Sequence, residues 1–387
     1  DADGSVLVRF AYTRDEAGNP VAIDRETGLG TFYYEYDGLQ RLEYEGQYAG
    51  GSREYENYYH YDAVGNRTLR KHLEEAAEEL TYYTYNEANE LTRLHDPDGW
   101  TYFAYDGNGN TVKDQRPSFT RYYDYDGRNL LTRVRSTEAG WTDNEFKYDG
   151  TGMRVWKKDS TGGTYYDWDG LSLIQQKDGS GNVTDRQVHG HSPITGVGDI
   201  AHMDKSGSVY VPAHDQVGTV WNLLDDAAAR VNSYTYDAFG VGRSVSESVS
   251  NLYRFQTKPL DGEIDQYYFV ARQYHVDVGR FLQPDLQRVS KPLVLPWTLN
   301  AYPLELNKPL VALDPSGYMT CEPVRSWCWA RLTRVAGYSR GIGTDSRVAE
   351  VLGCRWRVNL YTLIRCCDPA EGTFYLIKKA ERSMWAH

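Results

Sequence analysis

The sequence predicts an all-β fold built from antiparallel hairpins, and two observations support this prediction. The first is a short aromatic motif that recurs every 20 to 25 residues through the first half of the chain. The second is composition, since the 387 residues include 33 Tyr and 36 Gly and the mean hydropathy is −0.65. Many aromatic residues and glycines without long apolar runs are typical of short strands joined by tight turns.

The recurring motif is an aromatic residue, any residue, a second aromatic and then Asp or Asn. Its copies begin at Tyr34, Tyr59, Tyr83, Phe103, Tyr123, Phe146 and Tyr166. Aromatic side chains two residues apart lie on one face of a strand. The Asp-Gly or Gly-Asn that follows supplies a turn with positive φ. A shorter apolar alternation, for example Leu91 with Arg93, is then expected to return as the partner strand.

Stacking explains why the motif repeats. One hairpin cannot bury its aromatic face alone, whereas neighbouring hairpins can lay tyrosine beside tyrosine. The copies therefore predict a long, continuous antiparallel sheet that is strongly twisted or curled. An alternative is that the tyrosines bind sugars or bases. The Asp that follows the aromatic pair is interpreted as a turn residue, because a calcium site needs several oxygen ligands at loop spacing.

The composition changes abruptly after residue 318. Residues 1–318 hold 31 Lys and Arg against 48 Asp and Glu, whereas residues 319–387 hold 11 against 6. All five cysteines follow this point, and 30 of the 33 tyrosines precede it. We therefore predict a repeat segment over 1–208, a second segment with its own motifs over 209–318, and a tail over 319–387. The chain begins without Met, and we expect it to be a fragment whose N-terminal portion is missing.

The repeat resembles the YD repeat of the Rhs family, which includes bacterial Rhs polymorphic toxins, the C components of Tc toxins and the YD shell of teneurins. Residues 267–285, "YYFVARQYHVDVGRFLQPD", and 300–318, "NAYPLELNKPLVALDPSGY", resemble the RHS repeat-associated core of this family. The resemblance covers about residues 10–318. It implies a β-hairpin ribbon that spirals into a hollow shell, here a partial one, with a small mixed module at the C-terminal end.

In the toxin branch of the family this core is an aspartyl autoprotease. The resemblance implies Asp285 and Asp314 as the catalytic pair and a cut between Tyr318 and Met319. Two close carboxylates share one proton, so one can activate water while the other protonates the cleaved group. Because the target bond lies in the same chain, proximity contributes much of the rate.

Other interpretations of these residues stay open from the sequence. The Asp-Pro-Ser-Gly that begins at Asp314 also fits an ordinary type I or type II turn. Asp285 also fits a residue at the end of a strand. Arg280 fits either a support that orients a carboxylate or carbonyl, or a surface arginine.

The tail gives less specific information. Its basic residues are compatible with a nucleic-acid target. It has no Cys-x-x-Cys pair, so zinc is not expected, and neither a metal nor another cofactor is assigned to the chain. Residues 345–353 read as a short helix. The alternative is a small terminal module without enzymatic activity.

Two functions of different classes follow. The first is a shell that encloses its own C-terminal segment as cargo and releases it by self-cleavage, with a delivery or secretion machinery on the N-terminal side and no turnover of other substrates. The second is an extracellular or cell-surface adhesion protein without catalysis, which binds cell-surface glycans. Both imply a secreted or surface-associated bacterial protein, and no run of about 18 apolar residues predicts a membrane span.

Overall fold

The computed structural model describes residues 8–25, 29–189, 200–285 and 300–318, and four strands of the tail. These residues form β-strands and short 3-10 turns, with no α-helix among them. The predicted all-β fold class is therefore confirmed. The helix predicted over 345–353 lies outside the described residues.

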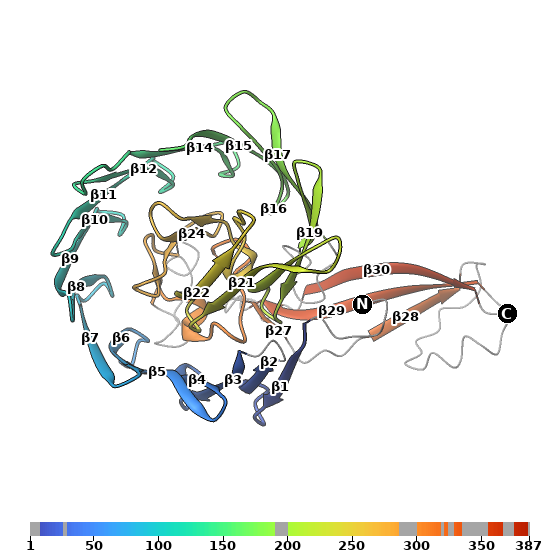
Figure 1. Cartoon of the computed structure of the whole chain (residues 1–387), viewed down its shortest axis with the longest axis horizontal. Helices are drawn as coiled ribbons and strands as arrows, with labels where there is room; N and C mark the ends of the chain where they lie inside the picture. The colour runs from blue at the N-terminus through green and yellow to red at the C-terminus, as the bar shows by residue number, and fades with distance from the viewer. Residues whose placement is uncertain are drawn as a thin grey trace.

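Twenty-two strands form one sheet, in which each strand pairs antiparallel with the next along the chain. The strands are β1 Phe10–Arg14, β2 Pro20–Arg25, β3 Gly30–Tyr36, β4 Leu42–Ala49, β5 Ser52–Tyr61, β6 Arg67–Glu74, β7 Ala77–Tyr85, β8 Leu91–Asp96, β9 Gly99–Tyr105, β10 Thr111–Gln115, β11 Thr120–Tyr125, β12 Leu131–Ser136, β13 Asn144–Tyr148, β14 Arg154–Asp159, β15 Gly162–Asp169, β16 Ser172–Lys177, β17 Val183–His189, β18 Ile200–Lys205, β19 Ser208–His214, β20 Val220–Asp225, β21 Arg230–Tyr236 and β22 Gly242–Glu247. Figure 1 shows this ribbon following an open ring, with β21 and β22 turning inside it. We call these strands the ribbon.

A smaller four-stranded sheet lies inside the ring (Figure 1). Together with its flanking 3-10 turns we call it the core segment. Its elements are η1 Phe255–Thr257, β23 Leu260–Asp261, β24 Gln266–Tyr268, β25 Gln273–His275, β26 Arg280–Phe281 and η3 Leu304–Asn307. The tail strands, β27 Cys321–Pro323, β28 Trp329–Arg334, β29 Arg355–Cys366 and β30 Tyr375–Trp385, form a separate antiparallel sheet.

The turn after each aromatic pair is built around the Asp carboxylate. At Asp126, Oδ1 accepts hydrogen bonds from the backbone N–H groups of Arg128 and Leu130, at 2.9 and 3.0 Å. The residue with positive φ is Asn129, at 62°, and not the glycine that directly follows the aspartate. The predicted turn is therefore present, but its left-handed position lies two residues later than the Asp-Gly pattern indicated. The Asp126 carboxylate thus accepts the hydrogen bonds of its own turn, in agreement with the interpretation of this Asp as a turn residue.

The two aromatics of the motif have different tasks. The first is buried in six of the seven copies, as Tyr123 and Phe146 illustrate, and half-buried at Phe103. The second donates a hydrogen bond to a carbonyl oxygen of the preceding repeat: Tyr125 to Thr111 at 2.8 Å and Tyr148 to Leu131 at 2.6 Å. The same bond is made by Tyr36, Tyr61, Tyr85, Tyr105 and the indole of Trp168. Each copy of the motif thus supplies one aromatic ring to the packing and one hydrogen bond to the preceding repeat.

The returning strand does not alternate as predicted. The register shifts at the second aromatic, between Thr84 and Tyr85 in this hairpin. The buried residues are consequently Leu91 and Leu94, while Arg93 is exposed. A bulge of this kind inserts one residue and breaks the two-residue period, which explains why Leu91 and Arg93 do not share a face.

The ribbon extends past the boundary expected at residue 208. Strands β18 and β19 pair across that position, and the sheet continues to β22. The last strands pack against the first ones: Phe32 contacts Trp221 and Tyr59 contacts Phe239, with ring centroids 5.8 and 5.1 Å apart. The ribbon therefore encloses its own C-terminal strands before the core segment begins.

We expect the inter-repeat hydrogen bond to contribute measurably to stability. Tyr125→Phe should lower the free energy of unfolding by about 1–2 kcal/mol, because the Thr111 carbonyl loses its donor. Urea unfolding measures this loss. Tyr122→Phe is the matched control, since this tyrosine is 36% exposed and no hydrogen bond of its hydroxyl is recorded among the described residues. Equal effects of the two substitutions would contradict the role of the bond.

Candidate active site

Aromatic packing in the core segment fixes the position of one buried arginine. Phe269, Tyr274 and Phe281 pack together, with ring centroids 5.3 to 5.7 Å apart. Arg272 lies between β24 and β25, and its guanidinium carbon is 3.6 Å from the centroid of the Phe281 ring. A guanidinium held against an aromatic face in this way can donate hydrogen bonds to carboxylate partners.

Both predicted catalytic aspartates meet this arginine. Arg272 Nη2 lies 2.9 Å from Asp314 Oδ2 and 3.8 Å from Asp285 Oδ2. All three side chains are buried. The Asp285 backbone N–H also donates to the carbonyl oxygen of Ala301 at 2.9 Å, which fixes the chain directly before residues 286–299. The structure therefore brings together two carboxylates that are 29 residues apart in the sequence.

Each of the three residues before Tyr318 has its carbonyl oxygen bound by a hydrogen bond. Lys258 Nζ donates to the Pro315 oxygen at 2.8 Å, and the Ala271 N–H donates to the Ser316 oxygen at 3.1 Å. Arg272 Nε donates to the oxygen of Gly317. These three hydrogen bonds fix the position of the main chain directly before Tyr318.

Gly317 permits this close approach. Its φ is +79°, a conformation that favours glycine, and its N–H donates to Asp314 Oδ1 at 2.8 Å. A Cβ at this position would overlap the carbonyl oxygen of Phe269. Residues 314–317 therefore form a turn closed by the Asp314 carboxylate, and the catalytic interpretation of Asp314 stays a prediction.

The residues on either side of the predicted cut differ in what the structure describes. Tyr318 is half-buried, and its ring centroid is 6.0 Å from the Arg272 guanidinium carbon. Burial raises the pKa of its phenol above 10.0, so the ring is uncharged at neutral pH. Met319 lies outside the described residues.

Arg280, the residue predicted to support the aspartates, lies instead against turns of the ribbon. Its guanidinium donates to Asn66 Oδ1 at 3.0 Å and to the carbonyl oxygen of Asn89 at 2.6 Å, both in ribbon turns. The arginine that contacts the aspartates is Arg272, which the sequence analysis did not single out. The sequence did contain one signal for Arg272, since it lies within the aromatic run "YYFVARQYH". An arginine in such a run is expected to be buried, and a buried charge needs partners.

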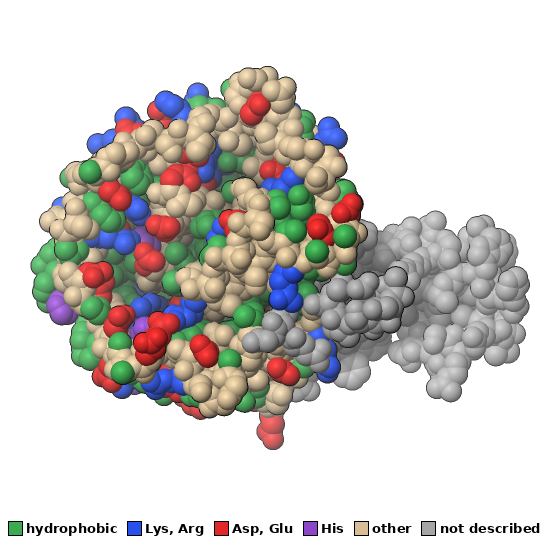
Figure 2. All heavy atoms as spheres, viewed as in Figure 1, with side chains coloured by type: hydrophobic (Ala, Val, Ile, Leu, Met, Phe, Trp, Pro, Cys, Tyr) green, Lys and Arg blue, Asp and Glu red, His purple; other side chains and the backbone are tan. Residues whose placement is uncertain are grey.

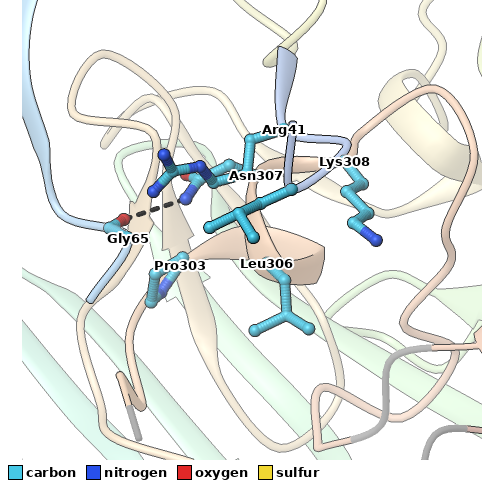
Figure 3. Close-up of a pocket in the computed structure, with 7 residues that line it drawn as sticks. Arg41, Gly65, Pro303, Leu306, Asn307 and Lys308 are labelled. Carbon is cyan, nitrogen blue, oxygen red and sulfur yellow. Dashed lines mark hydrogen bonds between the residues drawn. The ribbon is translucent and has the colours of Figure 1, made fainter. Parts of the chain in front are cut away.

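Further contacts fasten the core segment to the rim of ribbon turns. Tyr302 donates to the Gly109 oxygen at 2.8 Å, and Asn307 Nδ2 donates to the Gly65 oxygen at 2.9 Å. Figure 3 shows Asn307 reaching Gly65 beside a small pocket, which Arg41 and Leu306 also line. The aspartate site is thus braced against the ribbon.

Within the described ranges, no three or more His, Cys, Asp or Glu side chains gather in a way that could hold a metal ion. In the same ranges no helix has the length and apolar character needed to cross a membrane.

Comparison with known families identifies the ribbon. The family described as the teneurin YD-shell matches residues 26–310, which is most of the chain. The chain belongs to the YD-shell family. The resemblance expected from the repeat is thereby confirmed. Comparison with curated protein sequences gave no match.

Solved YD-shell structures share the fold. The crystal structure of TcdB2-TccC3-Cdc42 aligns with a TM-score of 0.63 at 18% identity, covering 82% of this chain and 17% of that one. That of TcdB2-TccC3 aligns at 0.62 and 18%, covering 82% and 18%. A form of TcdB2-TccC3 without its hypervariable C-terminal region aligns at 0.62 and 19%, covering 82% and 17%. The present chain spans less than a fifth of the length of each of these three chains.

Proposed function

We propose that this YD-shell chain hydrolyses its own Tyr318–Met319 peptide bond with Asp285 and Asp314, and so frees residues 319–387. One observation carries the proposal: a single buried guanidinium contacts both aspartates and the Gly317 carbonyl, one residue before that bond. The same contacts hold the chain on the N-terminal side of the bond against the site. A turn without a catalytic role requires no second buried carboxylate.

The chemistry uses the two carboxyl groups in opposite roles. One accepts a proton from water as the water oxygen attacks the Tyr318 carbonyl carbon, and the other gives its proton to the carbonyl oxygen. The tetrahedral intermediate then collapses as a proton passes to the Met319 nitrogen and the C–N bond breaks. The products are a carboxyl group on Tyr318 and an amino group on Met319. Arg272 holds both aspartates in place.

The enclosing role of the shell belongs to the same proposal. Figure 2 shows acidic side chains at many points of the ring, in agreement with the excess of Asp and Glu over residues 1–318. The tail is basic, so enclosure by an acidic shell is electrostatically favourable. A related structure is described as lacking a hypervariable C-terminal region, and residues 319–387 are proposed as the corresponding variable cargo. Secretion, delivery from the N-terminal side and a nucleic-acid target of the cargo follow only as extensions of this proposal.

Intact mass measurement tests the cut. The parent chain, 44.2 kDa when whole, should separate under denaturing conditions into residues 1–318 and 319–387. Asp285→Asn and Asp314→Asn should each stay whole. Asp237→Asn is the control, because this aspartate is also buried but lies in a ribbon turn. A parent that stays whole while folded would exclude self-cleavage and leave a structural shell, with glycan binding to be tested on residues 1–318.

A further inference from the structure

One backbone carbonyl, that of Ala301, links the arginine and the first aspartate of the candidate site. Its oxygen accepts hydrogen bonds from Arg272 Nη1 at 3.0 Å and from the Asp285 N–H at 2.9 Å. Ala301 is buried, as are both of these partners. The position of the Ala301 peptide therefore sets where Asp285 lies relative to Arg272.

A side chain of the ribbon binds the residue before Ala301. Asn66 lies in the turn between β5 and β6, and its Oδ1 accepts hydrogen bonds from Asn300 Nδ2 at 2.6 Å and from Arg280 Nη1 at 3.0 Å. Arg280 Nη2 also lies 3.4 Å from Asn300 Oδ1. All three side chains are buried. The ribbon thus contacts the candidate site through Asn300 and the Ala301 peptide that follows it.

The turn of the ribbon fixes the orientation of the Asn66 amide. Its Nδ2 donates to Asp62 Oδ2 and to Asn89 Oδ1, each at 2.9 Å. Because the Asp62 carboxylate can only accept and the Arg280 guanidinium can only donate, the amide nitrogen must face the ribbon and the amide oxygen must face β26. Both N–H groups and both acceptor positions of the amide are then in use.

A second asparagine shows which of these contacts belong to the repeat. Asn110 occupies the same place in the turn between β9 and β10 and is also buried. Its Nδ2 donates to Asp106 Oδ2 and to Asn129 Oδ1, each at 2.8 Å. Among the described residues, its Oδ1 accepts no hydrogen bond. The repeat therefore accounts for the donor contacts of Asn66, whereas its acceptor contacts with Arg280 and Asn300 are particular to this turn.

We infer that Asn66 is a positioning residue: through Asn300 it fixes the Ala301 carbonyl, which in turn holds Asp285 and Arg272 in register. The consequence for cutting rests on the proposed self-cleavage, whereas the contacts do not depend on it. Asn66 and Asn300 are 234 residues apart, so they meet only when the ribbon turn packs against the core segment. Self-cleavage that needs this contact therefore follows closure of the ribbon around the site.

Hydrogen exchange tests the contact whether or not the chain cuts itself. In a cleavage-blocked Asp314→Asn background, Asn66→Ala should speed exchange of the Asp285 amide about tenfold, because the Ala301 carbonyl that accepts it is less firmly held. Asn110→Ala is the matched control, since it loses the same two donor bonds within the ribbon and should leave the Asp285 amide unchanged. Unchanged exchange in Asn66→Ala, or an equal rise in the control, would overturn the inference.

The rate of self-cleavage separates positioning from a merely structural role. Asn66→Ala should cut about tenfold more slowly than the parent, because the site loses its alignment, whereas Asn110→Ala should stay within about threefold of the parent. Urea unfolding of both variants shows whether they lose similar stability. Equal slowing of the two variants would show that Asn66 acts only through the stability of the ribbon.

A double-mutant cycle identifies the path. Asn300→Ala should slow the cut about as much as Asn66→Ala, and the combined variant should be no slower than the slower single one, since both changes remove the same contact. Independent effects that multiply would contradict a path through Asn300. A parent that never cuts refutes the proposed function instead, and the exchange experiment then decides on Asn66 alone. Asn300→Ala replaces Asn66→Ala in that experiment if the latter fails to fold.

Discussion

Gly317→Ala is expected to slow self-cleavage at least about a hundredfold while the shell stays folded, because displacing a reacting group by an ångström costs that much. The added Cβ would overlap the Phe269 carbonyl oxygen, and the φ of +79° is strained for alanine. The chain must therefore move away from β24, and the Gly317 carbonyl leaves Arg272. The fraction of cut chain against time, read by intact mass, measures the effect.

A second glycine provides the control for this substitution. Gly262 lies between β23 and β24, and a Cβ there meets no atom within 4 Å. Gly262→Ala should cut at the parent rate. If Gly317→Ala also cuts at that rate, then the close approach at Phe269 does not position the bond, and the proposed geometry of the site is wrong.

The largest stability effect is expected at Asp261, which fastens the core segment to the ribbon. Arg154 Nη1 contacts both carboxylate oxygens, at 2.9 and 2.8 Å, and Gln273 Nε2 donates at 2.6 Å. Burial alone would raise the pKa of Asp261, but Arg154 and Lys157 hold it below 3.8. Asp261→Asn leaves two buried cations short of a partner and should cost about 3–5 kcal/mol.

Urea unfolding of Asp261→Asn beside Asp124→Asn measures this difference. Asp124 and Arg135 form an ion pair at 2.8 Å with both side chains 43% exposed, so its loss should cost less than about 1 kcal/mol. Because the folded pKa of Asp261 is depressed, its stabilisation is present above pH 3.8 and lost as the pH falls through the folded value. Equal losses in the two variants would mean that the buried network does not hold the core segment.

Local features of the fold could be predicted from sequence because local contacts produce them. An aromatic pair followed by Asp marks a strand and its turn whatever the rest of the chain does, and seven copies made the continuous sheet predictable. The bulge between Thr84 and Tyr85 could not be predicted in this way. The extra residue depends on the register of the neighbouring strand. As a result, the second buried residue of this strand is Leu94 and not Arg93.

The site required the tertiary structure. The resemblance pointed to Asp285 and Asp314, and the structure places both on one arginine, but two arginines of the core segment were equally available from sequence. Arg272 directly precedes β25 and Arg280 begins β26, so the intervening turn places Arg280 at the ribbon turns and leaves Arg272 at the aspartates.

The sequence by itself determined the repeat, its aromatic packing, the Asp-centred turns and the family, since each depends on residues within one hairpin or on the order of motifs. Only the tertiary structure decided how far the ribbon extends and which cation contacts the two carboxylates. Those outcomes depend on side chains that lie tens to hundreds of residues apart, as Arg280 and Asn66 do. Such contacts exist only after the ribbon has curled around the core segment.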